Sequence, residues 1–517
     1  AFKDLGELDN AINSYQKATH LDYKLYEAYY NLGVVFIQLK RFNKAIESFQ
    51  TAIEINPNFS QSYNNLGSAL MSQGRVKESI KYFKKALDID AVYVNAHNNL
   101  GIALTDLGQL KAGAKSIERA IEIDPDFAEA HNSLGNIFKK FKKRDKALIC
   151  YKRAYEIKPD MDFVLGSVLN SKMHLCIWGE LSSQIEDLVR RVDNNEKTID
   201  PFNQLGLIDN PQLQRKTTEI RMNSAHPNSH ILSKINPYSN HSKIRIGYFS
   251  ADFKIHPVST LTAELYEAHD RDHFEIHAFS FGPDTNDEMN LRIKAGVDHF
   301  HNVEVMSHKD IALLARSLEI DIAVDLTGLT AKSRTDIFAM SAAPIQLSYI
   351  GFLGTMAADY YDYLIADPVM IPRESQKHYA EKIVYLPSFQ VNDSKDLPPE
   401  ITLSREDVGL PETGFVFCCF NNTWKITPTV FDSWARILDA VKGTVLLIYI
   451  DNKTAEKNLI NEIKSRGVDP KCIIFADRYE RPEYLARYRV ADLFLDTHPY
   501  NAGTTASDAL KMGLPLL

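Results

Sequence analysis

Apolar and small residues recur with a period of 34 positions along the first third of the chain. The triplet "NLG" places Gly33, Gly67 and Gly101 one period apart, and "SLG" supplies Gly135. The same period carries three further columns: Ala52, Ala86, Ala120 and Ala154; Phe49, Phe83, Ile117 and Tyr151; Pro57, Ala91, Pro125 and Pro159. Small residues let two helices approach closely, and proline ends the second helix of a pair. The pattern predicts four helix pairs over residues 26–161, preceded by the end of an earlier pair over 1–25.

These columns resemble the tetratricopeptide repeat, so we expect residues 1–161 to form an α-solenoid that begins within an earlier repeat. Asn31, Asn65 and Asn99 keep the same period. A column of asparagine amides on one face of a solenoid could bind the backbone of an extended peptide. The alternative is that these amides cap or bridge neighbouring helices.

The pattern changes after the repeats. Residues 162–240 show helical segments without a period and end in the polar stretch "NPYSNHSK", which predicts a helical linker region. Residues 241–390 and 391–517 then alternate short apolar runs with helical segments, which predicts two lobes, each with a parallel sheet covered on both faces. The predicted strands are "KIRIGYFS", "FEIHAFSF", "DIAVDLTG", "IQLSYIGF", "YLIADPVMI" and "KIVYLP", followed by "GFVFCCFN", "TVLLIYID", "CIIFADRY" and "ADLFLDTH".

Polar residues and glycines follow the predicted strands, where ligands of doubly wound folds bind. The loop after the first strand carries His256, and Gly354 follows "IQLSYIGF". After the last strand, Thr504 and Thr505 begin a helix whose free N–H groups suit a phosphate, and Lys425 is the natural countercharge. The alternatives are that a threonine only caps the helix and that the histidine is structural.

Composition and motifs exclude several classes of protein. A net charge of −8 argues against general nucleic-acid binding, and no apolar run is long enough to span a membrane. Five cysteines without a C-x-x-C spacing suggest reduced thiols and a cytoplasmic protein. Neither a P-loop nor a G-x-G-x-x-G motif occurs, and no Asp-x-Asp pair falls at a predicted sheet edge. We therefore expect no ATPase or dehydrogenase activity, no metal-bridged nucleotide and no cofactor.

The combination of repeats and strand-end motifs resembles the protein O-GlcNAc transferase family, which includes the SPINDLY-type protein O-fucosyltransferases. The motifs that carry the resemblance are "GYFSADFKIHPVS", "DLTGLTAKSRTDIFA", "APIQLSYIGFLGTMAADYYDYLIAD", "FNNTWKITPTVFDSWARIL" and "LFLDTHPYNAGTTASDALKMGLP". The resemblance implies two Rossmann-like lobes in the GT-B arrangement. It also implies a nucleotide-sugar donor, UDP-GlcNAc, and metal-independent, inverting transfer to Ser or Thr hydroxyls of proteins selected by the repeats.

The resemblance also implies roles for individual residues. His256 and His299 match histidines of the active-site cleft, and Lys425 matches the lysine that stabilises the departing diphosphate. The residues that the resemblance assigns to donor binding are Gly354, Asn422, Arg481, Tyr484, Thr504, Thr505 and Asp508. Of these, Asp508 is expected on the ribose hydroxyls, and Tyr484 and Arg481 on the base.

Two alternatives stay open at this stage. Gly503 stands where animal members have histidine, and "FNNTWKITP" is at least as close to SPINDLY types, so GDP-fucose is a second candidate donor. The chain also ends within a strand after "KMG". We therefore expect a piece of a longer protein, and a protein-binding scaffold with an inactive transferase lobe is the other alternative.

Overall fold

The computed structural model describes residues 6–229, 231–233, 235–238 and 241–517. The chain divides into two compact units between Val164 and Leu165, and each is described by itself. Among the described residues, no helix has the length and apolar character needed to cross a membrane.

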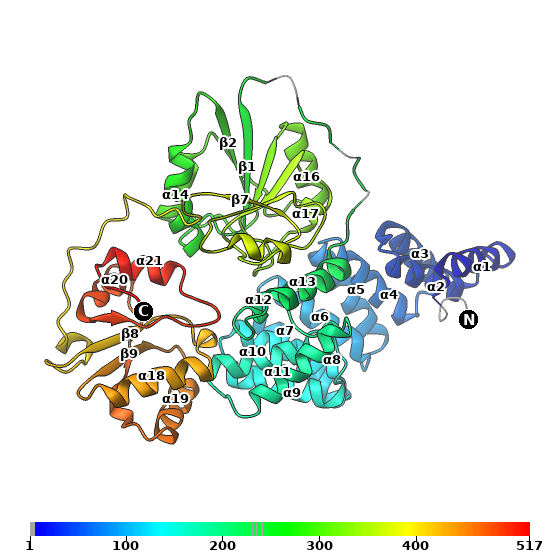
Figure 1. Ribbon diagram of the computed structural model, residues 1–517. Coiled ribbons are helices and arrows are strands. Elements are labelled where there is room, and N and C mark those ends of the chain that lie inside the picture. The colour runs from blue at the N-terminus through cyan, green and yellow to red at the C-terminus, as the bar shows by residue number, and fades with distance from the viewer. Residues whose placement is uncertain (1–5, 230, 234, 239–240) are drawn as a thin grey trace. The chain divides into compact units, whose positions relative to one another are not determined.

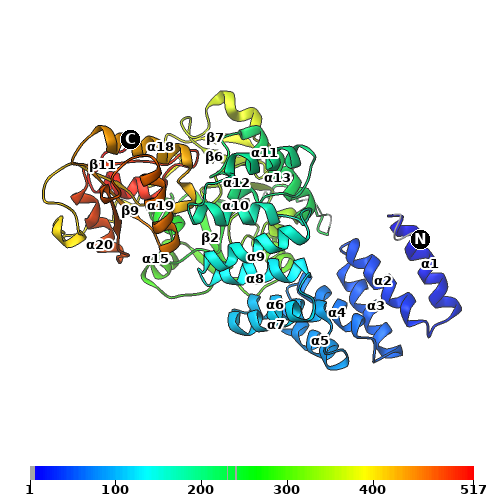
Figure 2. The same ribbon diagram turned by 90° about the horizontal axis from the view of Figure 1, so that it is seen from below.

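The first unit consists of antiparallel helix pairs (Figure 2). Helix α1 (Leu8–Leu21) precedes four pairs: α2 (Tyr26–Gln38) and α3 (Phe42–Ile55); α4 (Ser60–Ser72) and α5 (Val76–Ile89); α6 (Val94–Asp106) and α7 (Leu110–Ile123); α8 (Ala128–Lys140) and α9 (Arg144–Ile157). The glycine column lies where the helices of a pair touch. A Cβ atom on Gly67 would stand 2.6 Å from the ring of Phe83, which is fully buried. The predicted repeat array is therefore confirmed.

The second unit begins with helices and continues as two sheets. Four helices occupy much of the predicted linker region: α10 (Val164–His174), α11 (Leu181–Asp193), α12 (Pro201–Gln204) and α13 (Pro211–Ala225). Asp200 and Asn210 cap α12 and α13 through their side chains, and a proline follows each cap. These helices pack on the sheet-containing lobes, as the contacts below show.

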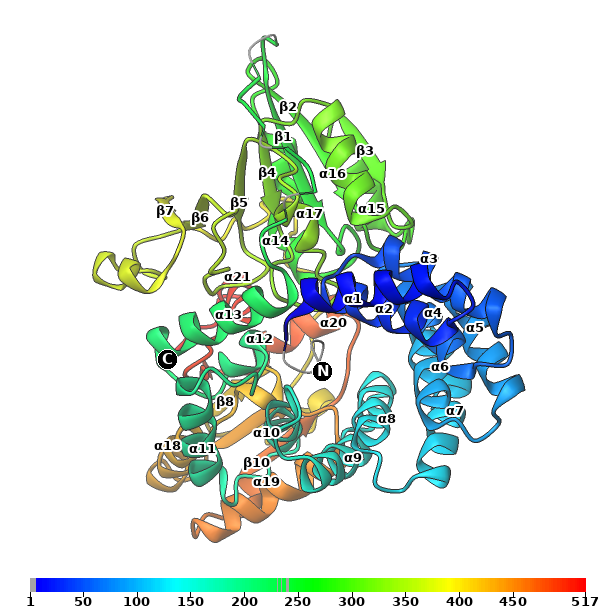
Figure 3. The same ribbon diagram turned by 90° about the vertical axis from the view of Figure 1, so that its right-hand side faces the viewer.

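The first sheet is entirely parallel, with the strand order β3-β2-β1-β4-β5-β6-β7 (Figure 3). Its strands are β1 (Ile244–Ser250), β2 (Phe274–Ser280), β3 (His299–Asn302), β4 (Ile322–Asp325), β5 (Ile345–Ser348), β6 (Tyr363–Ala366) and β7 (Lys382–Tyr385). The order reverses at β1, which is the topology of a doubly wound fold. Edge strand β3 is the one strand of this sheet outside the sequence prediction, because "HFHN" is short and mostly polar.

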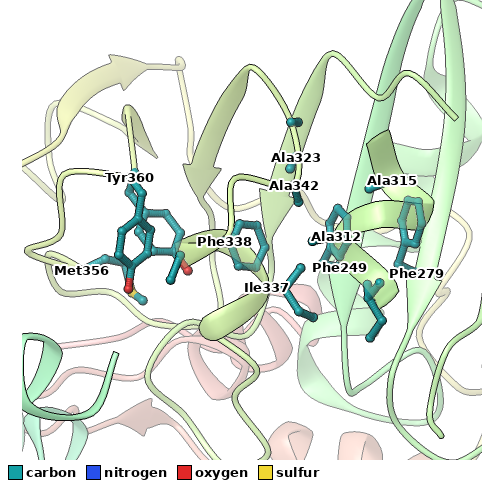
Figure 4. Close-up of a cluster of buried hydrophobic side chains, with 14 of the residues drawn as sticks. Phe249, Phe279, Ala312, Ala315, Ala323, Ile337, Phe338, Ala342, Met356 and Tyr360 are labelled. Carbon is teal, nitrogen blue, oxygen red and sulfur yellow. The ribbon is translucent and has the colours of Figure 1, made fainter. Parts of the chain in front are cut away.

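Successive residues of β1 face opposite sides of the sheet and build two cores. Tyr248 packs with residues of α14 (Pro257–Ala268) and α15 (Glu288–Gly296). Phe249 packs with residues of α16 (His308–Ser317) and α17 (Asp336–Ala339), and its ring stacks on Phe279 at 4.4 Å (Figure 4). Both faces of the sheet are thus covered, as the continuous apolar strands predict.

The second sheet is also parallel, with the order β10-β9-β8-β11. Its strands are β8 (Val416–Cys419), β9 (Val445–Tyr449), β10 (Ile473–Ala476) and β11 (Leu493–Phe494). The helices that accompany it are α18 (Pro428–Ala440), α19 (Lys453–Ser465), α20 (Arg481–Ala486) and α21 (Thr504–Lys511) (Figure 1). The predicted architecture, a repeat array followed by a parallel α/β region, is confirmed.

Candidate functional site

The loop between β11 and α21 is held by one half-buried carboxylate. Asp496 accepts hydrogen bonds from the backbone N–H groups of Thr497 at 2.7 Å and Ala502 at 2.8 Å. It also accepts one from the Nδ2 atom of Asn421 at 3.0 Å. These bonds close the loop and fix the position at which α21 begins. Its first residues, Thr504 and Thr505, present the free N–H groups of a helix N-terminus.

Lys425 lies beside this loop. It ends the short 3₁₀ helix Thr423–Lys425 after β8, and its Nζ atom donates to the carbonyl of Asn501 at 2.9 Å. The ammonium also lies over the ring of Tyr500, 4.2 Å from its centroid. Burial lowers the pKa of Lys425 to about 8, although the nearby Asp496 carboxylate acts in the opposite direction. The lysine therefore contacts the loop that leads into α21, three residues before the helix begins.

The asparagine that contacts α21 is Asn421, which sequence reasoning missed. Asn421 is almost fully buried, and its Oδ1 atom accepts a hydrogen bond from the hydroxyl of Thr505 at 2.5 Å. Its predicted neighbour, Asn422, is exposed at the start of the 3₁₀ helix. The signal was present, because "NN" offers two amides after one strand, but a pattern cannot decide which of two adjacent loop residues points inward.

Three predicted donor-binding residues form a second group. Arg481, at the start of α20, donates to Asp508 of α21 at 3.0 Å and to Asp396 at 2.8 Å. Tyr484 lies one turn further along α20, and its hydroxyl is hydrogen-bonded to that of Tyr488 at 2.6 Å. Burial raises the pKa of Asp508, while Arg481 and Tyr484 act to lower it. The carboxylate is thus partnered but poorly solvated, and a ligand hydroxyl could share it.

His256 caps helix α14 at the end of the first loop of the first sheet. Its Nδ1 atom accepts a hydrogen bond from the backbone N–H of Val258 at 3.3 Å, and the Asp252 carboxylate lies 3.7 Å away. Burial is the largest cause that lowers the pKa of His256. The ring is therefore neutral at pH 7, and with Nδ1 accepting, its proton is on Nε2.

The structure places His299 away from the edge at which the strands end. It is the first residue of β3 and pairs with His277 of β2. Strand β2 ends three residues later, at Ser280, which pairs with Ser250 at the end of β1. Its Nε2 atom contacts Glu275 at 3.0 Å. Burial and the neighbouring imidazoles lower the pKa of His277 to about 4. His299 therefore joins a cluster on β2 and β3 and not the residues around Lys425.

Gly354 has a packing role in the structure. A Cβ atom there would lie 2.8 Å from the ring of Phe352. Gly354 lines a small cavity together with Pro201 of α12 and Pro211 of α13. Its surroundings are those of the interface between the first lobe and the preceding helices.

The asparagine column of the repeats lies on helices α2, α4 and α6. The Nδ2 atom of Asn65 donates to the hydroxyl of Tyr30 at 3.1 Å, and that of Asn99 to Asn64 at 2.9 Å. Each of these bonds joins one repeat to the preceding one. Asn31 instead donates to the carbonyl of Glu27 in its own helix at 2.8 Å. The bridging alternative thus describes Asn65 and Asn99.

Helices before the first sheet anchor the loop that carries Lys425. The hydroxyl of Thr423 donates to the carbonyl of His174 at 3.0 Å, and Asn458 of α19 donates to that of Leu175 at 2.7 Å. The ring of Trp424 packs on Phe202 with centroids 5.6 Å apart, and a Cβ atom on Gly206 would stand 2.3 Å from it. The predicted linker region is thus part of the packing that positions the site.

Fold and site together define a repeat-containing α/β protein in which a lysine contacts the loop before a helix N-terminus at the C-terminal edge of the second sheet. The chain belongs to glycosyl transferase family 41, whose family model matches residues 218–403 and 394–517. Tetratricopeptide repeat models match residues 1–40, 26–59, 59–124 and 128–161.

Among curated relatives, the chain is 33% identical over 374 residues to an Arabidopsis thaliana protein named probable UDP-N-acetylglucosamine–peptide N-acetylglucosaminyltransferase SEC. That match covers 68% of this chain and 38% of the relative. A rice protein (Oryza sativa subsp. japonica) named probable UDP-N-acetylglucosamine–peptide N-acetylglucosaminyltransferase SPINDLY is 29% identical over 278 residues. That match covers 52% of this chain and 30% of the relative. The chain therefore spans 38% of the length of the first relative and 30% of the second.

A solved structure of a Thermobaculum terrenum O-GlcNAc transferase mutant has a similar fold. It superposes with a TM-score of 0.62 at 24% identity and covers 89% of this chain and 82% of its own. At that identity the likeness supports the fold.

Proposed function

We propose that this chain transfers N-acetylglucosamine from UDP-GlcNAc to Ser or Thr hydroxyls of proteins, with inversion at the anomeric carbon. Its family and the names of its relatives support this activity. The observation that carries it is the position of Lys425, whose ammonium contacts the backbone three residues before α21 begins. A cation next to a helix N-terminus is suited to a diphosphate, the leaving group of a nucleotide sugar.

The reaction follows from this placement. The acceptor oxygen attacks the anomeric carbon, the bond from that carbon to the diphosphate oxygen breaks, and UDP departs with the bonding electrons. The proton of the acceptor hydroxyl passes to the departing diphosphate. Negative charge grows on the leaving oxygen in the transition state. Lys425 and the N–H groups at the start of α21 stabilise it there, where electrostatic stabilisation is most effective. Thr504 is the hydroxyl donor of the pair, because that of Thr505 is engaged by Asn421.

His256 orients the acceptor in this proposal. Its Nδ1 atom is occupied by the N–H of Val258, so the neutral ring offers Nε2–H as a hydrogen-bond donor and not a lone pair as a base. His299 is given no part in transfer, since it lies at the start of an edge strand and contacts Glu275.

The nucleoside is assigned to the group at α20 and α21. Asp508 accepts hydrogen bonds from the ribose hydroxyls while its ion pair with Arg481 is retained. The ring of Tyr484 stacks on the base. Donor binding by Asn422 and Gly354 stays a prediction from the sequence, because no contact described above joins the side chain of either residue to Lys425 or Asp508. Acceptor proteins bind along the repeats, on the face that carries Asn31, Asn65 and Asn99. A cytoplasmic location fits the free cysteines, of which Cys150, Cys176, Cys418 and Cys419 are buried.

Thermal stability with added nucleotides tests the donor. A ligand at 100 times its dissociation constant stabilises the folded state by about 2.7 kcal/mol, a shift that is readily measured. Stabilisation by UDP and UDP-GlcNAc alone supports the proposal, and a response to GDP and GDP-fucose alone assigns the fucosyl reaction instead. A chain stabilised by neither pair is a binding scaffold.

A lysine pair tests the site itself. Lys425→Ala is expected to abolish transfer while it retains the folded structure by circular dichroism. Lys442→Ala is the matched control, because Lys442 is 80% exposed and pairs with Asp439, three residues before it. Transfer that survives in Lys425→Ala would contradict the assignment.

A further inference from the structure

Four ionisable side chains lie together on one face of the first sheet, on its edge strand and the strand next to it. Glu275 and His277 are two residues apart on β2, and His299 and His301 are two residues apart on β3, so each pair points to one face. The register sets His277 directly opposite His299. The transfer proposed above uses none of the four.

Three ligand atoms converge within this group. The Oε1 atom of Glu275 lies 3.2 Å from Nε2 of His277 and 3.0 Å from Nε2 of His299. All three atoms lie within 4.8 Å of one another. Tetrahedral zinc, with bonds of about 2.0–2.1 Å to imidazole and carboxylate, separates its ligand atoms by roughly 3.3 Å. The two distances from Glu275 Oε1 are close to this spacing, and the histidine nitrogens lie within 4.8 Å of each other.

A second set of contacts orients the ligands. His277 meets Nε2 of His301 through its Nδ1 atom at 3.1 Å, and the second oxygen of Glu275 accepts from Arg245 at 3.2 Å. Ligating histidines commonly bond through their other ring nitrogen, and ligating carboxylates are hydrogen-bonded in turn. Arg245 would oppose a cation, but it also pairs with Glu319 at 3.2 Å. Two carboxylates against one guanidinium leave the surroundings net negative.

From this geometry we infer that Glu275 Oε1, His277 Nε2 and His299 Nε2 form a binding site for a divalent transition metal of the zinc type. Imidazole and carboxylate ligands suit zinc, and three protein ligands leave a fourth position for water. When the metal binds, the proton on Nε2 of each ring moves to Nδ1, and His277 then donates to His301. His299 is half exposed, which gives the ion a path from solvent. The site joins β3 to β2 and is separate from the donor site.

The test uses the full chain after chelation and dialysis, with Zn²⁺ followed by calorimetry and Co²⁺ by visible absorption. We expect one saturable Zn²⁺ equivalent, the intense absorption bands of four-coordinate Co²⁺, and a higher melting temperature with Zn²⁺. His299→Ala removes an exposed ligand and is expected to weaken binding at least 100-fold. His299→Cys restores a ligand and should recover affinity.

His273→Ala is the matched control. His273 precedes β2, is 74% exposed and pairs with Asp270, so its loss should leave Zn²⁺ affinity unchanged. The five free cysteines are the competing ligands, and binding to them would persist in His299→Ala. Equal affinity in His299→Ala and the wild type, or the absence of a saturable equivalent, overturns the inference. Neither result depends on transferase activity, so this experiment tests the metal site independently of the proposed function.

Discussion

The hydroxyl of Thr505 donates a hydrogen bond to the Oδ1 atom of Asn421 at 2.5 Å, which joins the start of α21 to the loop after β8. Asn421 in turn donates to Asp496 and to the hydroxyl of Thr497. The two threonines at the start of the helix therefore differ in their partners. Thr505 belongs to the internal bonds of the lobe, which leaves Thr504 as the donor toward a ligand.

A pair of threonine substitutions tests this difference. Thr505→Val leaves the buried Asn421 oxygen without its donor and is expected to lower the free energy of unfolding by about 1–3 kcal/mol. Thr504→Val should change it by less than about 0.5 kcal/mol and weaken UDP binding instead. Urea denaturation and calorimetry with UDP measure the two effects. Equal losses of stability in both variants would contradict the assignment.

The pKa of Lys425 predicts proton uptake when UDP binds. Burial lowers this pKa to about 8, so at pH 8.5 much of the free protein carries a neutral lysine. A diphosphate favours the charged form and raises the pKa, so binding takes up a fraction of a proton at pH 8.5 and almost none at pH 6.5. Calorimetry in buffers of different ionisation enthalpy measures this uptake, and UDP affinity should fall as the pH rises above 8.

Lys425→Arg is the control for this prediction. A guanidinium stays charged throughout the range, so both the proton uptake and the decline in affinity above pH 8 should disappear. Proton uptake of the same size in Lys425→Arg would assign the titration to another group.

The ion pair of Arg481 and Asp508 predicts a pH-dependent loss of stability. Arg481→Leu removes the partner of a buried carboxylate, which should cost about 3–5 kcal/mol at neutral pH. Burial already raises the pKa of Asp508, and the loss of Arg481 raises it further. The folded state of the variant then favours the protonated carboxyl group. Its stability is therefore retained at low pH and lost as the pH rises through the raised pKa, so the difference from the wild type is smaller at pH 4.5 than at pH 8.

Two further variants check that cause. Asp508→Asn removes one of the two carboxylates that pair with Arg481 and should make the effect of Arg481→Leu less dependent on pH; the dependence that remains belongs to Asp396. The double variant should be more stable than Arg481→Leu alone at pH 8. A constant difference between Arg481→Leu and the wild type across this range would rule out the buried charge as the cause.

The close packing of Gly67 predicts a strong effect within the repeats. A methyl group there would lie 2.6 Å from the ring of Phe83, which has no free space because it is fully buried. Gly67→Ala is expected to lower the stability of the repeat array by about 1–3 kcal/mol despite the better helix propensity of alanine. Ser72→Ala, on the exposed side of the same helix, should have little effect or a slightly stabilising one. Thermal unfolding of the two variants makes the comparison.

Much of this fold could be predicted because it depends on periodic packing. The 34-residue period gives the helix pairs directly, and continuous apolar runs give ten of the eleven strands found in the described part of the chain. Strand β3 could not be predicted, because a polar edge strand of four residues is defined by its hydrogen bonds to β2 and not by its own composition. The contacts of α10–α13 with both lobes also leave no periodic signal, because they involve single residues far apart in sequence.

The candidate site was predicted less completely, for a related reason. The edge of the sheet, Lys425 and the start of α21 follow from topology, so the sequence indicates them. The choice of Asn421 over Asn422 depends on the local turn, and the position of His299 depends on where β3 begins. Both are set by the register of neighbouring segments, which a single sequence does not contain.

The bond from Thr423 to the carbonyl of His174 has a consequence for how genes of this kind can be recombined. A crossover near residue 240 would separate the second lobe from the helix that holds its lysine loop and would expose one side of Trp424. A crossover at the end of the repeats cuts none of those contacts. A segment that is to keep the lysine loop with its support therefore begins at about the first residue of α10, where the two compact units of the chain meet in sequence.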